Sequence, residues 1–292
     1  MKAADFDYLR AGSLDEVCTA LAGANGDGKV IAGGQTLVPM MAMRLARPAL
    51  LIDINDVDEL RGIAAEGDVL AVKACTRQSD ALSSPVVAQH LPLLAKAIHF
   101  VGHVQTRNRG TVGGSICHAD PSAEIPLTAL TVDAVLVARS ARGERRIAVD
   151  DFFVGPMMTT LEPDECLAEV RFPVWQGGRV GTGFQEVSAR ISDFAIVSVA
   201  AQVVVDAAGA CTRAAIAIGG AGARPVRCDP AAQAVIGSTL DSAAIAKAAA
   251  MVPDLIEPDT DLHATADYRR RVARALVERA LAQAAADAAE RA

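Results

Sequence analysis

Residues 107–126 read RNRGTVGGSICHADPSAEIP, and this stretch interrupts a regular alternation of short strands and helices. Its glycine pair, Gly113 and Gly114, is flanked by the hydroxyl groups of Thr111 and Ser115. Paired glycines permit positive φ angles and let the backbone approach a ligand closely. Consecutive backbone N–H groups in such a turn bind anions. The stretch therefore predicts an anion-binding loop, and the alternative is a plain structural turn.

A second glycine pair occurs upstream, in the segment AGGQTL at residues 32–37. The apolar residues 29–32 predict a strand before it, and residues 38–44 predict a helix after it, with Pro39 tolerated in the first turn. The N-terminus of a helix offers open N–H groups to an anion. Two such loops in one domain could hold the two sides of one pyrophosphate. No G-x-G-x-x-G follows a strand, which disfavours a Rossmann dinucleotide fold.

The first half of the chain predicts further short elements. Ser13 and Glu16 form a capping box at the start of a helix. Residues 106–121 show no periodicity, so we expect no regular structure there. The remaining expected elements are helices over 77–83 and 86–104, the latter interrupted by Pro92, and strands over 133–139, 145–149 and 165–172.

Proline and glycine cluster between residues 173 and 183, where the sequence pattern changes. We place a domain boundary there, giving domains 1–176 and 177–292. Beyond it, long β-rich runs precede helices, an order typical of an α+β fold. The elements expected in this second domain are strands over 183–187, 195–205 and 211–218 and helices over 230–236, 241–251 and 264–289.

Composition excludes several classes of function. The chain has 292 residues, a net charge of −7 and 3% aromatic residues, which argues against a nucleic-acid-binding face. No apolar run is long enough to cross a bilayer, and the N-terminus has no apolar signal region, so we expect a cytoplasmic protein. The six cysteines lack the C-x2-C spacing of zinc or iron–sulfur ligands. We therefore expect no metal site in this chain.

Two motifs look functional but have simpler explanations. Residues 23–29, GANGDGK, match most of a P-loop, but Val30 stands where a magnesium-binding hydroxyl is needed. The segment also follows a predicted helix and precedes a strand, the reverse of the P-loop order. His99 and His103 have the i, i+4 spacing of zinc ligands, but Phe100 occupies the place of a catalytic glutamate. An ordinary turn and an ordinary helix explain these two segments.

The two glycine loops, with HADPSAE at 118–124 and SDFA at 192–195, resemble the FAD-binding medium subunit of the molybdenum hydroxylases. This family includes xanthine dehydrogenase, carbon monoxide dehydrogenase and quinoline oxidoreductase, and the resemblance covers essentially the whole chain. It implies an α+β protein, in which an FAD-binding domain of the vanillyl-alcohol-oxidase (PCMH) type precedes a smaller α+β domain with a three-stranded type of sheet and helices.

The resemblance also implies which residues contact FAD. Backbone N–H groups of the two loops would hold the pyrophosphate. Glu124 stands where the family usually has an aspartate bonded to ribityl or ribose hydroxyls, and Leu167 would touch the adenine. The implied contacts are Val30, Ile31, Ala32, Gly33, Gly34, Gln35, Thr36, Leu37, Val101, Thr111, Gly113, Gly114, Ser115, Ile116, Glu124, Leu167, Gln185, Glu186 and Phe194.

Some of these positions carry a specific expectation. Val101 and Ile116 would contact the flavin or its linker. Gln185 and Glu186 stand where the family often has a lysine near the flavin. Phe194 matches an aromatic residue, often tyrosine, beside the isoalloxazine ring, and the alternative is a core phenylalanine of the second domain.

The implied function is electron transfer, with no catalytic side chain and no metal ligand in this chain. FAD would accept electrons from two [2Fe–2S] clusters in a small iron–sulfur subunit and pass them to an external acceptor. A large subunit would carry the molybdopterin cofactor, and the assembly would be a dimer of heterotrimers. Two alternatives remain: a self-contained flavoprotein oxidase or reductase of the same fold, and a scaffold that has lost its cofactor. Gln35 replaces the histidine that anchors flavin covalently in some such oxidases, which counts against the self-contained oxidase. Both glycine loops are intact, which counts against a scaffold without cofactor.

Overall fold

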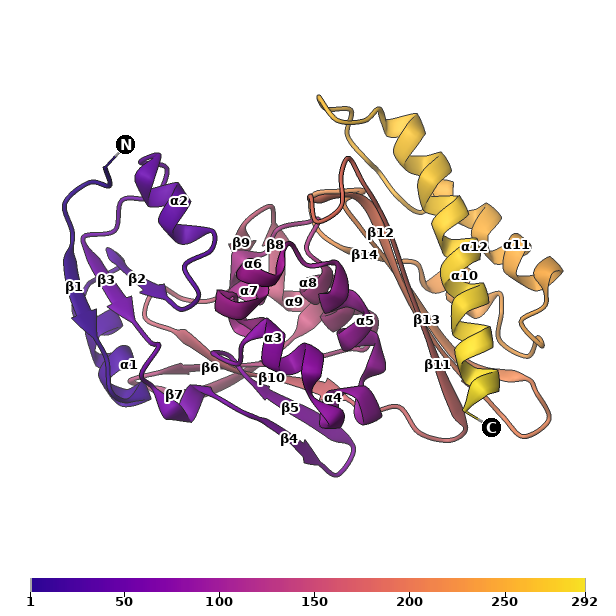
Figure 1. The fold of residues 1–292 in the computed structure, drawn as a ribbon, viewed down its shortest axis with the longest axis horizontal. Coiled ribbons are helices and arrows are strands. Elements are labelled where there is room, and N and C mark those ends of the chain that lie inside the picture. Colours follow the sequence, from indigo (N-terminus) through magenta and orange to yellow (C-terminus); the bar gives the residue numbers. More distant parts are fainter. Residues whose placement is uncertain (1, 292) are drawn as a thin grey trace.

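The computed structural model describes residues 2–291. Figure 1 shows a first domain that contains a three-stranded sheet, a five-stranded sheet and a short two-stranded pair and, beside it, a second region in which a tall antiparallel sheet is backed by a long helix. Within residues 2–291, no helix combines the length and the hydropathy needed to cross a membrane.

The first sheet has three parallel strands in the order β1-β3-β2. Helix α1 connects β1 to β2, and the Ser13 hydroxyl accepts a hydrogen bond from Glu16 N at its start, which confirms the predicted cap. Helix α2 follows β2 after a short loop. The bounds are β1 Asp7–Arg10, α1 Leu14–Gly23, β2 Gly28–Ile31, α2 Leu37–Ala42 and β3 Leu50–Asp53.

The second sheet is antiparallel, with the order β4-β5-β10-β6-β7. Strand β10, the last of the five along the chain, lies at its centre between β5 and β6. The bounds are β4 Ile63–Glu66, β5 Val69–Lys73, β6 Val135–Ser140, β7 Gly143–Ala148 and β10 Cys166–Pro173.

Helices between β5 and β6 cover this sheet and carry the main apolar core of the domain. Pro92 begins helix α5 rather than bending a longer helix, because the proline ring suits the first helical turn. The bounds of these helices are α3 Gln78–Ser83, α4 Pro85–His90, α5 Pro92–Phe100, α6 Val104–Arg109, α7 Val112–His118 and α8 Glu124–Thr131. The remaining short elements are η1 Asp58–Leu60 before β4, and α9 Val149–Phe152, β8 Phe153–Gly155 and β9 Met158–Thr159 between β7 and β10.

The expectation of an irregular segment over 106–121 is wrong in part. Helices α6 and α7 occupy most of it, and both glycines of the pair lie in the first turn of α7. The apolar periodicity is weak because the first turn of α7 packs through Gly113, which has no side chain, directly on Ala74.

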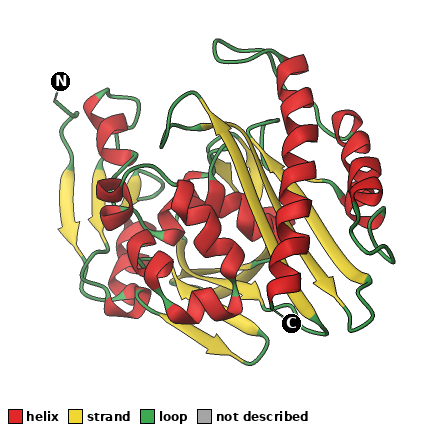
Figure 2. Ribbon diagram, turned by 45° about the vertical axis from the view of Figure 1, so that its right-hand side comes forward, coloured by secondary structure: helices red, strands yellow, loops and turns green. Residues whose placement is uncertain are grey.

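The sheet of the second domain has three long antiparallel strands, as expected, and a two-residue fourth strand at one edge. In Figure 2 the long helix α12 runs in front of this sheet. The bounds are β11 Arg179–Ser188, β12 Ala195–Val205, β13 Cys211–Gly219, β14 Val226–Arg227, α10 Asp229–Gln233, α11 Ser242–Met251, η2 Val252–Asp254 and α12 Ala266–Glu290.

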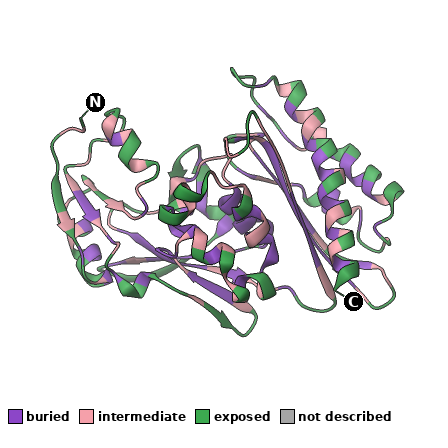
Figure 3. Cartoon of the chain, in the orientation of Figure 1, coloured by how far each residue is buried: buried purple, intermediate pink, exposed green. Residues whose placement is uncertain are grey.

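The two faces of this sheet have different neighbours. One face packs on α12, and a Cβ added at Gly181 or Gly183 would overlap the helix backbone at Ala284 or Ala280. The opposite face, which includes Phe184, joins the apolar core of the first domain. Figure 3 accordingly shows β12 buried along nearly its whole length.

A polar tie also joins the two domains. Lys96 Nζ of α5 donates to Thr182 O of β11 at 2.7 Å and to Asp287 Oδ2 of α12 at 3.0 Å. The same carboxylate oxygen accepts hydrogen bonds from the backbone N and the hydroxyl of Thr182. This cluster fixes the first domain to both the sheet and the helix of the second.

Candidate cofactor-binding site

The loop from Gly33 to Leu37, between β2 and α2, has open backbone donors. Within residues 2–291, none of its five backbone N–H groups donates a hydrogen bond to the protein. Gly34 has a φ of 69°, in the left-handed region that favours glycine. Consecutive backbone N–H groups without a protein acceptor can bind water or an anion, so this run of five is the candidate anion site.

In the second glycine segment, which we define as residues 107–126, the backbone N–H groups at the glycine pair already donate to acceptors within the protein. The N–H groups of Val112 and Gly113 donate to Thr76 O and Ala74 O at 3.0 and 2.9 Å. Gly114 N donates to the Thr111 hydroxyl at 3.0 Å, and the next N–H group, that of Ser115, bonds Thr111 O within the helix. The expected second set of open backbone donors is therefore not formed by residues 112–115, because the protein itself uses them.

Gly33 and Gly113 are required because a side chain at either position would overlap neighbouring atoms, and not because of their φ angles. A Cβ added at Gly113 would lie 2.5 Å from Ala74 Cβ. A Cβ added at Gly33 would overlap Arg109 O and lie 2.9 Å from Gly110 Cα. Neither residue has a positive φ. The first loop and the second segment therefore touch each other backbone to backbone at Gly33.

Positive charge gathers around the two segments. Four arginines, Arg61, Arg77, Arg107 and Arg109, form no ion pair with a carboxylate of residues 2–291. Arg77 bonds Arg109 O, and Arg107 Nη1 bonds the carbonyls of Val101 and Gly102 at 2.8 and 2.7 Å. In a chain with a net charge of −7, this local excess of cations favours an anionic ligand.

The downstream end of the region is acidic and buried. Glu124 begins α8 and is 8% exposed, and burial raises the pKa of its carboxyl to about 7. Burial and the neighbouring Glu124 raise the pKa of Glu186 to about 8. Glu186 Oε2 and the hydroxyl of its cross-strand neighbour Ser198 are buried without a protein partner. Unpartnered buried polar atoms of this kind indicate a place for a bound hydroxyl or water.

Several expected contacts are placed differently. Gln185 lies on the α12 face of β11 and donates to Gln283 Oε1 at 2.9 Å, so it is not brought to the two segments. Ile116 and Leu167 are 0% and 3% exposed and pack in the core of the first domain, so this structure offers almost no surface of either residue to a ligand. Val101, half-buried, ends α5, and its carbonyl holds Arg107.

Phe194 is 72% exposed, which excludes the alternative of a core residue. It lies between β11 and β12 and lines a cleft of about 280 Å³. Pro121 and Ser122, which follow α7, line the same cleft. The structure therefore brings Phe194 next to the end of the second glycine segment.

The described residues offer no metal centre. Residues 2–291 contain no group of three or more His, Cys, Asp or Glu side chains arranged to hold an ion, and all six cysteines are free thiols. Sequence reasoning missed Asn55 and Arg77, which hold the two segments together, because each acts on segments distant in the sequence.

Comparison with protein families gives two matches along the chain. Residues 4–175 match the FAD binding domain in molybdopterin dehydrogenase. Residues 182–284 match the CO dehydrogenase flavoprotein C-terminal domain.

Relatives match over nearly their whole length. The 6-hydroxypseudooxynicotine dehydrogenase complex subunit alpha of Paenarthrobacter nicotinovorans is 40% identical over 97% of this chain and 96% of its own. The carbon monoxide dehydrogenase medium chain of Hydrogenophaga pseudoflava is 35% identical over 94% and 96%.

Solved structures agree with this. A chain of carbon monoxide dehydrogenase from Hydrogenophaga pseudoflava superposes with a TM-score of 0.94 at 36% identity, covering 98% of this chain and 99% of the other. A chain of quinoline 2-oxidoreductase from Pseudomonas putida 86 gives a TM-score of 0.93 at 35% identity, covering 99% of both.

Proposed function

The chain belongs to the family of FAD-binding subunits of molybdopterin dehydrogenases, and from this premise we propose how it holds its flavin and what it is joined to. The pyrophosphate of FAD binds the five open N–H groups from Gly33 to Leu37. This run of free donors is the observation that carries the proposal. The unpaired arginines beside it supply the charge that a diphosphate requires.

The remaining site residues divide along the length of the cofactor. Val30, Ile31 and Ala32 lead the chain into the pyrophosphate loop. The exposed part of α7, at Gly114 and Ser115, borders the same region. The other proposed contacts, downstream of the loop, are Val101, Thr111, Gly113, Ile116 and Leu167.

Glu124 and Glu186 serve the flavin end of the site. With pKa values raised to about 7 and 8, Glu124 is about half protonated and Glu186 mostly protonated at pH 7, and in the protonated form each can donate a hydrogen bond as well as accept one. Phe194 lies over the adjoining cleft and limits access from solvent. We keep the domain division at 1–176 and 177–292 as part of this proposal.

The bound flavin supplies electron transfer in single or paired steps. The chain's own residues bind, orient and shield it, and none acts as a catalytic acid or base toward the substrate. We propose a heterotrimer with a small iron–sulfur subunit carrying two [2Fe–2S] clusters and a large molybdopterin subunit, two heterotrimers forming the cytoplasmic enzyme. An external acceptor receives the electrons. The names of the relatives, a dehydrogenase complex subunit and a medium chain, support this arrangement.

The test is a reconstitution of the full chain. The purified chain should bind FAD without a covalent bond and release it on acid precipitation. It should not oxidise N-heterocycles, aldehydes or carbon monoxide until the two partner subunits are added. A chain that oxidises such a substrate alone would instead be a self-contained oxidase, and a chain that binds no FAD would contradict the proposed site.

A further inference from the structure

Asn55 is bonded at both ends of its side-chain amide. It lies two residues after the end of β3, and its Nδ2 donates to Ala32 O at 2.8 Å, at the entry to the open loop. Its Oδ1 accepts a hydrogen bond from Arg77 Nη2 at 2.6 Å. Asp53 Oδ1 holds Asn55 in place by accepting from its Nδ2 and its backbone N at 2.6 and 2.8 Å. These partners fix which end of the amide faces which neighbour.

Arg77 extends this connection to the second glycine segment. It lies just before α3, close to the end of β5, and its Nη1 donates to Arg109 O. Its guanidinium therefore spans from Asn55 to the backbone position against which Gly33 packs. Burial lowers the pKa of Arg77, and Arg109 and Arg61 also lower it, consistent with a cation that lacks a carboxylate partner among residues 2–291.

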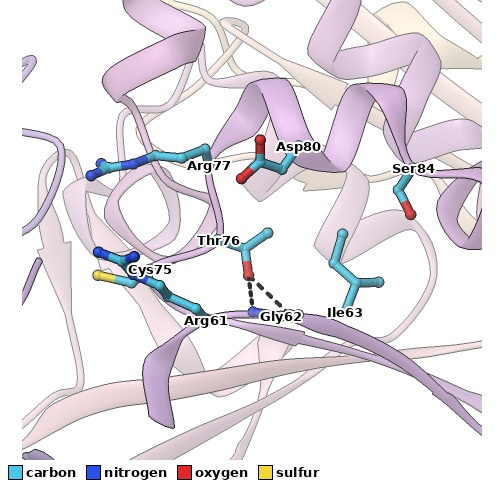
Figure 4. Close-up of a pocket in the computed structure, with 8 residues that line it drawn as sticks. All are labelled: Arg61, Gly62, Ile63, Cys75, Thr76, Arg77, Asp80 and Ser84. Atoms are coloured by element: carbon cyan, nitrogen blue, oxygen red, sulfur yellow. Dashed lines mark hydrogen bonds between the residues drawn. The ribbon is translucent and has the colours of Figure 1, made fainter. Parts of the chain in front are cut away.

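Figure 4 shows Arg77 and Arg61 at a pocket of about 310 Å³, with both guanidinium groups extending to the same side, away from Asp80. Arg61 also reaches Asn55, but through the backbone carbonyl. It therefore adds charge to the cluster without joining the two segments.

The connection links two different sheets. Asn55 follows a strand of the parallel sheet, whereas Arg77 follows a strand of the antiparallel sheet. An apolar cluster that includes Ile52, Cys75 and Ala168 already packs these sheets together. The polar connection is therefore not needed to keep the sheets in contact, but it determines the spacing of the two segments at their tips.

We propose that Asn55 and Arg77 are positioning residues for the cofactor: they set the distance between the open loop at Gly33 and the backbone at Arg109, and so shape the site for a diphosphate. This inference rests on the proposed function. The bidentate guanidinium is required because a lysine ammonium cannot hold two acceptors in a fixed plane. The amide of Asn55 is required because it must donate to one segment and accept from the other.

Two variants break the connection in different ways. Arg77→Lys keeps the charge and loses the planar fork. Asn55→Asp keeps the acceptor for Arg77, replaces the donor to Ala32 O with a second acceptor, and adds one negative charge beside Asp53. Arg61→Gln is the control for charge: it lowers the charge of the same cluster by one, as Asn55→Asp does, and removes the hydrogen bond to Asn55 O, but it leaves both connecting side-chain bonds intact.

The measurement is the dissociation constant of FAD for the full-length apoprotein, by quenching of flavin fluorescence, together with the thermal unfolding midpoint of the apoprotein. We expect Arg77→Lys and Asn55→Asp to raise the dissociation constant at least tenfold while the midpoint falls by less than about 4 °C. Arg61→Gln should raise it less than threefold.

Two results would overturn the inference. One is wild-type FAD affinity in both Arg77→Lys and Asn55→Asp. The other is an equal loss in Arg61→Gln, which would assign the effect to charge alone. If Asn55→Asp does not fold, Arg77→Lys decides the question by itself. A wild-type chain that binds no FAD would contradict the proposed function directly, so the two failures are distinguishable.

Discussion

The loop Gly33–Leu37 leaves five backbone N–H groups without a protein partner, whereas residues 112–115 donate all four of theirs to acceptors within the protein. Both segments carry a Gly-Gly pair. The first pair lies between strand β2 and helix α2, and the second lies in the first turn of helix α7. In the first, Gly34 adopts a positive φ and Gly33 packs on the backbone at Arg109, which leaves the donors of the loop free of protein acceptors. In the second, glycine lets a helix approach Ala74. The same dipeptide therefore has different uses, and only its tertiary neighbours reveal which.

The largest effect is expected at the second segment. Gly113→Val would place a Cβ 2.5 Å from Ala74 Cβ and 2.7 Å from its backbone atoms, with no room to move. We expect the free energy of unfolding of the apoprotein to fall by about 3 kcal/mol. Urea unfolding followed by circular dichroism measures it. A loss under about 0.5 kcal/mol would contradict the packing role.

Gly33→Ala tests the place where the two segments meet. The added methyl overlaps Arg109 O and must push the loop away from the second segment. We expect a loss of about 2 kcal/mol in stability and, in addition, a weaker FAD complex. Calorimetric titration of FAD and urea unfolding of the same preparation separate the two effects. Loss of stability with unchanged FAD affinity would show that the spacing of the segments does not matter for binding.

The two segments also differ in the charge of their neighbours. Arginines surround the open loop, whereas buried carboxyls lie at the downstream end of the second segment. The raised pKa of Glu186 means that the folded protein keeps a proton that the unfolded chain releases above its ordinary pKa of 4.5. Wild-type stability should therefore fall as pH rises from 4.5 to about 8. Glu186→Gln should remove this part of the fall.

The expected advantage of Glu186→Gln over the wild type is near zero at pH 4.5 and about 2 kcal/mol at pH 9, after allowing for partial exposure. Unfolding curves of the apoprotein at several pH values measure it. Glu124 titrates in both proteins and cancels in the difference to first order. An advantage that does not change with pH would mean that Glu186 is ionised at pH 7.

The smallest effect on energy is expected at Gly114, the exposed glycine of the second segment. Gly114→Val puts a branched side chain on the surface that borders the cofactor and crowds the Thr111 hydroxyl. We expect FAD affinity to fall about tenfold, which is about 1.4 kcal/mol, and stability to fall by about 1 kcal/mol because the Thr111 hydroxyl that caps α7 must shift. Gly23→Val is the control, because no atom lies near a Cβ added there. Equal FAD binding by the two variants would remove α7 from the site.

Sequence alone predicts the local parts of this molecule well. The Ser13 cap, the loop at 33–37 and the long strands of the second domain depend on neighbouring residues and follow from them. The helical state of 112–118 does not, because its first turn is stabilised by Ala74 and Thr76, which lie more than 35 residues away. The central place of β10 depends in the same way on pairing with distant strands.

In the candidate site, too, some features follow from neighbouring residues and others depend on residues that are distant in the sequence. Alternation along β11 predicts that Gln185 and Glu186 face opposite sides, but only the packing of α12 determines which side is which. Asn55 and Arg77 carry no motif, since their role lies in bonds across 22 and 32 positions of the chain. Backbone chemistry can be inferred from glycine, whereas polar connections between sheets require the fold.

The tie at Lys96 has a consequence for the order of folding. Lys96 and Asp287 are 191 positions apart, so forming their contact from an unstructured chain would close a very long loop at a high entropic cost. That cost falls once the first domain has collapsed around the part of its cluster that residues 70–172 contribute and the second around the cluster between its sheet and α12. The docking of the domains should therefore come late in refolding, as a slow phase that removal of the Lys96 ammonium alters and that the early collapse of either domain does not share.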